Sequence, residues 1–267
     1  MDKKIISEAF ADRSKLEAAR QEILNTIEAL DKGQVRVAQK IDGSWQVNTW
    51  VKEAILLYFS LTSMQLWEAA PYQYRDKIPL KSQLEAAQVR NVPPGTVRYG
   101  AFMAPGSILM AGYVNIGAYV DVDTMVDTWT VVGSCAQIGA NVHLSAGVVI
   151  GGVLEPAGAR PVIVEKNCFI GANSVIVEGA LIEEDSVIGA GVTITGSTHI
   201  IDVTKSTPIT YKGYVPAHSI VIPGTRTRQF PAGNYDLPCA LIIGRHESGN
   251  DSKTCLNQAL RDFGEAK

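Results

Sequence analysis

The fold is decided by residues 164–200, which read VEKNCFIGANSVIVEGALIEEDSVIGAGVTITGSTHI. An isoleucine stands at every sixth position from Ile170 to Ile200. A period of six fits neither an α-helix nor the two-residue alternation of a plain strand. It is typical of a parallel β-helix, in which each hexad supplies one short strand and one corner. Three hexads then complete one coil of a three-sided prism.

The same period continues toward the N-terminus. We expect further inward-pointing aliphatic residues at Met110, Ile116 and Val122, and then at Val132, Ile138, Leu144 and Ile150. Glycine commonly follows the aliphatic residue, as at Gly139 and Gly171, and permits the sharp turn of a corner. Together the hexads predict about five coils of β-helix.

Three interruptions break this period. Ten residues instead of six separate Val122 from Val132, and the gap contains Asp127, Thr128 and Trp129. Eight extra residues lie between Ile150 and Val164, and a later excursion covers residues 205–212. Insertions of this kind form loops outside the coil, where binding residues are often found.

The flanking segments differ from the repeats. Residues 5–31 have a helical pattern, residues 35–47 read as a hairpin turning at Asp42-Gly43, and residues 49–60 read as a second helix. We therefore expect a small α/β domain over residues 1–95 and the parallel β-helix over residues 96–224.

A strand and a helix are expected after the repeats. Residues 239–244 read as the strand and residues 254–263 as a short amphipathic helix. We expect residues 225–267 to form a cap that covers the open strand edges of the last coil.

Composition excludes several classes of protein. Of 267 residues, 46% are hydrophobic and 19% are charged, as in a globular domain and unlike a disordered chain. The formal net charge of −3 argues against a nucleic-acid partner, and no apolar stretch approaches the roughly 20 residues of a membrane span. Four widely spaced cysteines and the absence of a secretory signal predict reduced thiols and a cytoplasmic location.

Hexads of this kind resemble the hexapeptide-repeat superfamily of left-handed β-helices, most of which are acyltransferases. Longer strings narrow the resemblance. They are YVNIGAYV at 113–120, TMVDTW at 124–129, VGSCAQIG at 132–139 and GGVLEP at 151–156, with RVA at 36–38 and VPA at 215–217. Together they closely resemble the tetrahydrodipicolinate N-succinyltransferase family of the diaminopimelate route to lysine, over nearly the whole chain.

The resemblance implies a homotrimer whose active sites lie between neighbouring subunits. The reaction it implies is direct transfer of an acyl group from succinyl-CoA to the substrate amine, without metal or covalent intermediate. Arg90, in VRNVPP, matches the family's substrate-binding arginine and suits a bidentate grip on a carboxylate. Asp127 matches the active-site aspartate, which would orient the amine and accept its proton.

Coenzyme-binding residues are predicted from residue type. The Gly189-Ala190-Gly191 corner has no bulky side chain, so an extended pantetheine arm can approach it closely. The candidate contacts for the coenzyme phosphates are basic: Lys205, Lys212, Arg226 and Arg228.

One motif departs from the family pattern. Where many members read Ala-Arg-Ser-Glu after Cys-Phe-Ile-Gly, this chain has Asn173 at the arginine position and Val175 at the glutamate position. Either Glu155 or Glu178 compensates, or the donor or substrate has changed. Acetyl-CoA is therefore an alternative donor, and tabtoxin biosynthesis, where the family has a branch, is an alternative pathway.

Two other functions fit less well. A zinc enzyme of this architecture needs three converging histidines, and His143, His199 and His218 show no short spacing. We therefore predict no metal. An ice-binding solenoid would show an uninterrupted threonine face, which the loop insertions do not suit. We expect a structural or supporting part for His143, and surface or loop positions for the other histidines, including His246.

Overall fold

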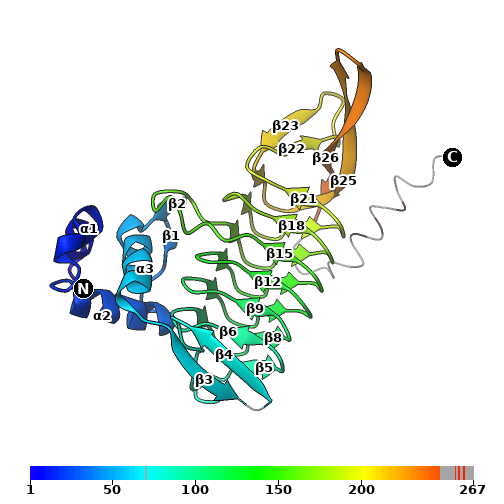
Figure 1. The fold of residues 1–267 in the computed structure, drawn as a ribbon. Coiled ribbons are helices and arrows are strands. Elements are labelled where there is room, and N and C mark those ends of the chain that lie inside the picture. Colours follow the sequence, from blue (N-terminus) through cyan, green and yellow to red (C-terminus); the bar gives the residue numbers. More distant parts are fainter. Residues whose placement is uncertain (70, 247–255, 257, 259–260, 262–267) are drawn as a thin grey trace.

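In the computed structural model, residues 1–69, 71–246, 256, 258 and 261 are described. The chain forms a three-sided prism of stacked short strands, with the N-terminal helices on one side and a long hairpin at the far end (Figure 1). This is the left-handed parallel β-helix that the hexads predict. Among the described residues, none of the helices combines the length and the hydropathy that a membrane span requires.

Helices and two hairpins precede the prism. The helices are α1 (Lys3–Ala11), the 3-10 helix η1 (Arg13–Lys15), α2 (Arg20–Asp31) and α3 (Thr49–Leu61). The hairpins are β1 (Ala38–Ile41) with β2 (Ser44–Val47), and β3 (Gln65–Ala69) with β4 (Tyr72–Asp76). The predicted helix over 5–31 is interrupted at Asp12, whose carboxylate accepts from Ser14 N and caps the next turn.

Each coil of the prism visits three faces in the same order. The first face holds β5 (Arg90–Val92), β8 (Ile108–Met110), β11 (Met125–Val126), β14 (His143–Leu144), β17 (Phe169–Ile170) and β20 (Val187–Ile188). The second face holds β6 (Thr96–Val97), β9 (Tyr113–Val114), β12 (Val131–Val132), β15 (Val149–Ile150), β18 (Val175–Ile176) and β21 (Thr193–Ile194). The third face holds β7 (Phe102–Met103), β10 (Tyr119–Val120), β13 (Gln137–Ile138), β16 (Ile163–Val164), β19 (Leu181–Ile182) and β24 (Tyr214–Val215).

The second residue of each two-residue strand points inward and forms the core. Val120 pairs in parallel with Ile138, three hexads later, and both are fully buried. The expected phase of the first coils is wrong, because Val126 is buried on β11 while Val122 is 39% exposed at a corner. Val114, Val120, Val126 and Val132 therefore continue the period without a break. Two aliphatic columns fit the sequence there, and only burial distinguishes them.

The three edges of the prism have different surroundings, and we name each after one of its residues. The Asp127 edge joins the first and second faces at residues 127–130, 145–148, 171–174 and 189–192. The Cys135 edge joins the second and third faces and packs against the helices, since Ile116 and Cys135 belong to the same buried cluster as Ile55 of α3. The His218 edge joins the third and first faces.

The predicted insertion after Ile150 is confirmed and lies on the Cys135 edge. Ile138 pairs with Val164, eight residues beyond three hexads. Lys52 of α3 is fully buried, and its Nζ donates to the carbonyl oxygens of Pro156 at 3.1 Å and Ala159 at 2.8 Å. The insertion thus joins the prism to the N-terminal helices and lies away from Asp127.

The last coil continues into a C-terminal sheet. Its strands are β22 (His199–Asp202), β23 (Ile209–Lys212), β25 (Ser219–Phe230) and β26 (Gly233–Arg245). The predicted strand 239–244 lies within β26. Most of the predicted helix 254–263 lies outside the described residues, although residues 256, 258 and 261 are helical and Leu256 packs near Val187. The three-part division at 95 and 224 stays a prediction, and β25 runs through the second boundary.

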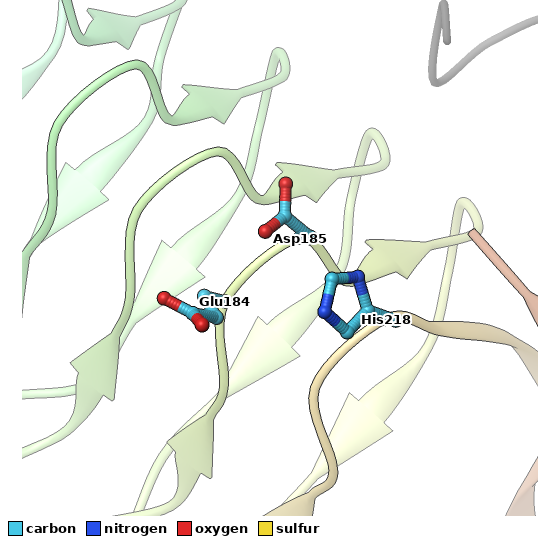
Figure 2. Close-up of side chains that lie close together, drawn as sticks. All are labelled: Glu184, Asp185 and His218. Carbon is cyan, nitrogen blue, oxygen red and sulfur yellow. The ribbon is translucent and has the colours of Figure 1, made fainter. Parts of the chain in front are cut away.

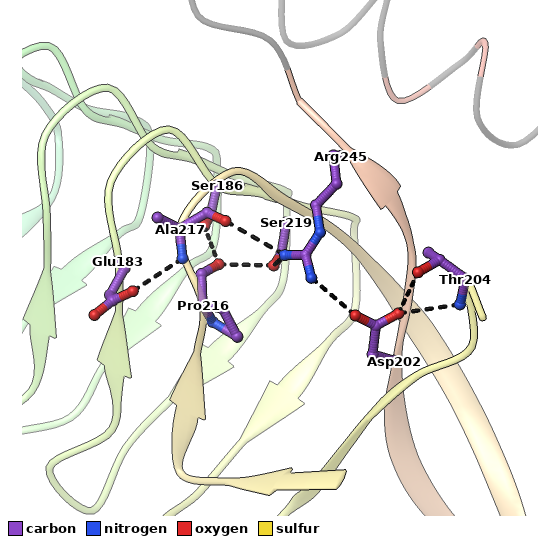
Figure 3. A network of polar contacts seen from close by, with 8 residues as sticks. All are labelled: Glu183, Ser186, Asp202, Thr204, Pro216, Ala217, Ser219 and Arg245. Carbon is purple, nitrogen blue, oxygen red and sulfur yellow. Dashed lines mark hydrogen bonds and ion pairs between the residues drawn. The ribbon is translucent and has the colours of Figure 1, made fainter. Parts of the chain in front are cut away.

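A polar network holds this sheet on the prism (Figure 3). Arg245 donates to Ser219 Oγ at 2.7 Å and to Asp202 Oδ2 at 2.8 Å. Thr204 donates to Asp202 through both its amide and its hydroxyl. Burial by itself would raise the pKa of Asp202, but these donors and the Arg245 charge lower it. The carboxylate is therefore fixed in its charged form, and the hairpin has a defined orientation.

Candidate functional site

Asp127 occupies the corner that directly follows β11. Its Oδ1 accepts from Thr128 N at 2.7 Å and from Thr128 Oγ1 at 3.2 Å. Its Oδ2 faces His143 on the next strand, with Nε2 at 3.6 Å. Both side chains are about one-third exposed, so a ligand on the Asp127 edge can reach the carboxylate. Residue type alone predicts only a structural or supporting part for His143. The sequence does contain a signal for its contact with Asp127, because His143 lies three hexads, or one coil, beyond Met125.

Trp129 stands two residues further along the same corner. It is 69% exposed, with a φ of 59° in the left-handed region. A bulky aromatic residue is rarely left in water or held at positive φ without a reason. Beside it a hollow of about 200 Å³ lies over the second face, between Trp129, Tyr113 and Pro94.

Above Asp127, the corners of the same edge carry small side chains. They stack in register, since Gly147 N donates to Thr128 O, Asn173 N to Ala146 O and Gly191 N to Ala172 O. The predicted Gly189-Ala190-Gly191 corner is the highest of the four. Gly191 adopts its φ of 70° without strain, and a Cβ on Gly189 would lie 3.1 Å from Val221 O. With strands about 4.8 Å apart, Asp127 and Gly189 are separated by about 14 Å.

A basic cluster lies beyond this corner. Strand β25 enters in register with β20, passes Gly189 and continues past the Asp127 edge. The cluster combines β22, β23 and β25: His199, Lys212, Arg226 and Arg228. Burial lowers the pKa of His199, and the positive charges of the other three lower it further. The Nε atom of Arg226 is buried without a hydrogen-bond partner among the described residues.

Lys205 and Arg90 lie apart from these groups. Lys205 follows β22 near Asp202, at the opposite end of the β22–β23 hairpin from Lys212. Arg90 is exposed on β5 and lies on the same first face as Met125, two strand spacings or about 10 Å below it. Within one chain, Arg90 therefore lies below Asp127 and not beside it.

The two departures from the family pattern lie close to the small-residue run. Asn173 is at the third corner of the Asp127 edge, and Val175 follows on the second face. The two suggested replacements lie on another edge: Glu155 is in the insertion, and Glu178 accepts from Gly196 N at 3.1 Å. Within one chain, neither glutamate lies on the edge that carries Asp127.

The three histidines weighed for zinc lie in three separate places. His218 is close to Glu184 and Asp185 on the His218 edge, with ligand atoms within 4.8 Å of one another (Figure 2). Lys166 is paired with Glu184 at 3.1 Å, and Asn167 donates to Asp185 at 3.3 Å. These contacts already give both carboxylates a structural role.

His246 lies in a loop just after β26, which is one of the two expected positions, but its side chain is buried and not at the surface. It is 5% exposed, and its ring Nδ1 lies 3.0 Å from the Asp185 carbonyl oxygen. Its own amide donates to His218 O at 2.7 Å, because β26 ends directly beside this corner. The residue therefore belongs to the packing of the C-terminal sheet.

Known proteins resemble this chain along its full length. Residues 2–61 match the N-terminal model of tetrahydrodipicolinate N-succinyltransferase, and residues 161–196 match the hexapeptide repeat of succinyl-transferase. A 2,3,4,5-tetrahydropyridine-2,6-dicarboxylate N-succinyltransferase from Aeromonas hydrophila is 48% identical, over 98% of both chains. The chain belongs to the tetrahydrodipicolinate N-succinyltransferase family. It is accordingly an N-acyltransferase, and the resemblance found in its motifs is confirmed.

A second relative is similar to nearly the same extent, and a solved structure is similar to a lesser one. The enzyme from Yersinia pestis (strain Pestoides F) is 46% identical over 96% of this chain and 97% of its own. Among solved structures, a putative 2,3,4,5-tetrahydropyridine-2-carboxylate N-succinyltransferase from Campylobacter jejuni matches with a TM-score of 0.47 and 19% identity. That match covers 83% of this chain and 62% of the other.

Proposed function

We propose that this N-acyltransferase moves the succinyl group of succinyl-CoA onto the amine of tetrahydrodipicolinate, formed as the ring opens with water. The observation that carries the proposal is the order of groups along the Asp127 edge. A carboxylate stands at its lower end, small residues follow, and a basic cluster lies at the top. An acyl-CoA needs these three environments in this order, for its thioester, its pantetheine arm and its phosphates.

The chemistry assigned to Asp127 is proton removal. The substrate amine attacks the thioester carbonyl, a C–N bond forms and the C–S bond breaks, and coenzyme A leaves with the bonding electrons. The attacking nitrogen must lose a proton, which Asp127 Oδ2 accepts because Oδ1 is held by Thr128. The proton finally reaches the departing thiolate, so the enzyme returns to its initial state. Holding the reactants in place supplies the rest of the rate.

The basic cluster fits the coenzyme phosphates. An orphaned buried Nε on Arg226 offers a hydrogen bond that the described residues do not use. Arg226, Arg228 and Lys212 together place three positive charges around His199. Guanidinium and ammonium groups bind phosphate through charge-assisted hydrogen bonds. Lys205 remains a second candidate at the other end of the hairpin.

Arg90 is proposed to bind a carboxylate of the cyclic dicarboxylate. Its side chain is exposed on the first face, and its planar guanidinium matches a carboxylate with two parallel hydrogen bonds. Because Arg90 lies about 10 Å below Met125 on its own chain, a substrate beside Asp127 is reached more directly from a neighbouring subunit.

A homotrimer is proposed on the same grounds. The outward residues of the second face include four apolar side chains in one column: Tyr113, Val131, Val149 and Val175. Val149 is 37% exposed and Trp129 is 69% exposed at the adjoining edge. Burying such a surface against a second copy is favourable by roughly 25 cal/mol per Å². The active site would then lie between subunits.

The remaining assignments follow from these residues. The side-chain amide of Asn173 can donate a hydrogen bond to the carboxylate of the succinyl group. It stands at the position where many family members have arginine. We propose no metal, since the reaction assigned to Asp127 requires only a proton acceptor. Cys135, Cys168 and Cys239 are free buried thiols, which supports the predicted cytoplasmic location.

Thiol release by the purified protein tests the function. We expect release from succinyl-CoA with tetrahydrodipicolinate, at a higher kcat/KM than from acetyl-CoA. Preference for acetyl-CoA would instead make Asn173 and Val175 the marks of an altered donor site. Release from neither donor would overturn the proposed acceptor.

A matched pair of variants tests Asp127. Asp127→Asn should lower kcat by about 100-fold or more, since the amide cannot accept the proton. Asp123→Asn is the control, because Asp123 stands at another corner with a φ of 54° that asparagine tolerates equally well. Equal turnover of the two folded variants would remove Asp127 from the mechanism.

A further inference from the structure

His143 lies opposite Asp127, and its position on the prism fixes this pairing. It is the outward residue of β14, in register with Met125 below and Phe169 above. Its ring packs against Phe169 with centroids 5.4 Å apart at 45°. Since neighbouring strands fix both contacts, the imidazole is held where its Nε2 faces Asp127 Oδ2 at 3.6 Å.

The two oxygens of Asp127 are not equivalent. Oδ1 already accepts two hydrogen bonds from Thr128, at 2.7 and 3.2 Å. Oδ2 is the oxygen that faces His143, on a side chain that is about one-third exposed. A proton delivered to Asp127 therefore arrives at the oxygen that His143 also faces. At 3.6 Å the two atoms are within ion-pair range, and such contacts often tighten when substrate binds.

Proton affinity separates the two groups. A carboxylate has an ordinary pKa of about 3.9 and an imidazole about 6.5, so imidazole holds a proton far better near neutral pH. General-base catalysis is most efficient when the acceptor titrates near the working pH. A carboxylate alone is a weak acceptor for an amine proton, and a carboxylate backed by a neutral imidazole is a stronger one.

We propose that His143 is a positioning residue that acts through Asp127, taking up the amine proton that reaches Oδ2. The inference rests on the proposed acyl transfer. As the C–N bond forms, the proton passes from nitrogen to Oδ2 and on to His143 Nε2. The ion pair of imidazolium and carboxylate then holds it. When the C–S bond breaks, the proton returns through Oδ2 to the thiolate, so no proton is gained or lost.

This arrangement requires His143 to be neutral before each turnover. Asp127 faces the imidazole with a carboxylate, whereas Met125 of β11 and Phe169 of β17, on the strands either side, carry no charge. Activity should therefore fall on the acidic side as the imidazole becomes protonated. With a merely structural histidine, the acidic limb would come from the Asp127 carboxylate alone and would lie at lower pH.

The test combines variants with a pH profile and chemical rescue. His143→Gln should lower kcat by about 100-fold with little change in the KM for succinyl-CoA, and should shift the acidic limb of kcat/KM to lower pH, where Asp127 alone becomes protonated. His143→Ala should regain at least tenfold activity with added imidazole. His218→Asn is the control on a different edge, since asparagine tolerates the φ of 61° there. A His143→Gln enzyme with the parent's turnover and acidic limb overturns the inference.

A second measurement does not depend on turnover. The imidazole of His143 is titrated by NMR in the parent and in Asp127→Asn. Removal of the facing negative charge should lower the pKa of His143, and an unchanged value overturns the pairing. A parent protein without transfer activity would defeat the proposed function, whereas an active His143→Gln enzyme would defeat this inference alone.

Discussion

Lys52 and Ala159 are joined by a hydrogen bond of 2.8 Å across 107 residues of sequence. The lysine belongs to α3 and the carbonyl belongs to the insertion between two coils. The ammonium group is fully buried, and burial lowers its pKa. A second bond to Pro156 O completes a clamp that fixes the N-terminal helices on the Cys135 edge.

Removing this clamp should destabilise the protein. Lys52→Met keeps the apolar stem but leaves two carbonyl groups without their donor, at a cost of about 2 kcal/mol in the free energy of unfolding. Urea denaturation measures the difference. Lys4→Met, on the exposed surface of α1, is the control and should leave the unfolding midpoint unchanged. Equal midpoints for both variants would show that the clamp contributes nothing.

Substitution of Arg90 should weaken the binding of the dicarboxylate substrate. Arg90→Lys retains the charge but loses the bidentate geometry, so we expect the KM for tetrahydrodipicolinate to rise about tenfold. The KM for succinyl-CoA should stay within twofold. Arg75→Lys, on the exposed strand β4, provides the control. An effect confined to the coenzyme would reassign Arg90 to the donor.

The two ends of the β22–β23 hairpin distinguish the phosphate contacts. Lys212→Ala should raise the KM for succinyl-CoA about tenfold, and by less at high salt, because one charge of the basic cluster is lost. Lys205→Ala should change it less, since Lys205 lies near Asp202. Steady-state kinetics at two salt concentrations measures both. A larger effect of Lys205→Ala would place the phosphates at the other end.

A charge on the second face should separate the proposed trimer. Val149→Asp introduces an unpaired charge into the apolar column while the inward Ile150 remains in the core. We expect light scattering to give a trimer for the parent and a folded monomer for the variant. Val122→Asp, similarly exposed at 39% but on the His218 edge, should remain trimeric. Loss of the trimer in Val122→Asp alone would place the interface elsewhere.

The free energy of unfolding at alkaline pH should depend on the raised pKa of the buried Cys135 thiol. Burial raises the pKa of Cys135 from 9.0 to about 12, so above pH 9 the unfolded chain loses a proton that the folded chain retains. The contribution of this thiol to the free energy of unfolding is therefore fully present below pH 9 and is lost as the pH rises toward 12. Between pH 9 and 10, Cys135→Ala should remove about 1 kcal/mol of that fall in stability. Parallel slopes in urea titrations between pH 9 and 10 would contradict this.

Much of the fold follows from local sequence. A six-residue period can be satisfied only by a strand-and-corner unit, so the prism, its core column from Val132 onward and the insertion after Ile150 were predictable. The turn at Asp42-Gly43 was also predictable, because both central residues of such a hairpin turn have positive φ, and Asp-Gly is one of the few pairs that tolerate it. The family resemblance, carried by motifs such as TMVDTW, likewise required no coordinates.

The tertiary structure decided which of these residues meet. Two aliphatic columns fit the first hexads, and only burial of Val126 chose between them, which placed Asp127 in a regular corner and not in a gap. The pair of Asp127 and His143 depends on the stacking of strands from successive coils. The basic cluster depends on the C-terminal hairpins, whose positions cannot be derived from the hexapeptide period. Sequence spacing fixes the face on which a residue lies. Contact across coils depends on how every insertion between them is accommodated.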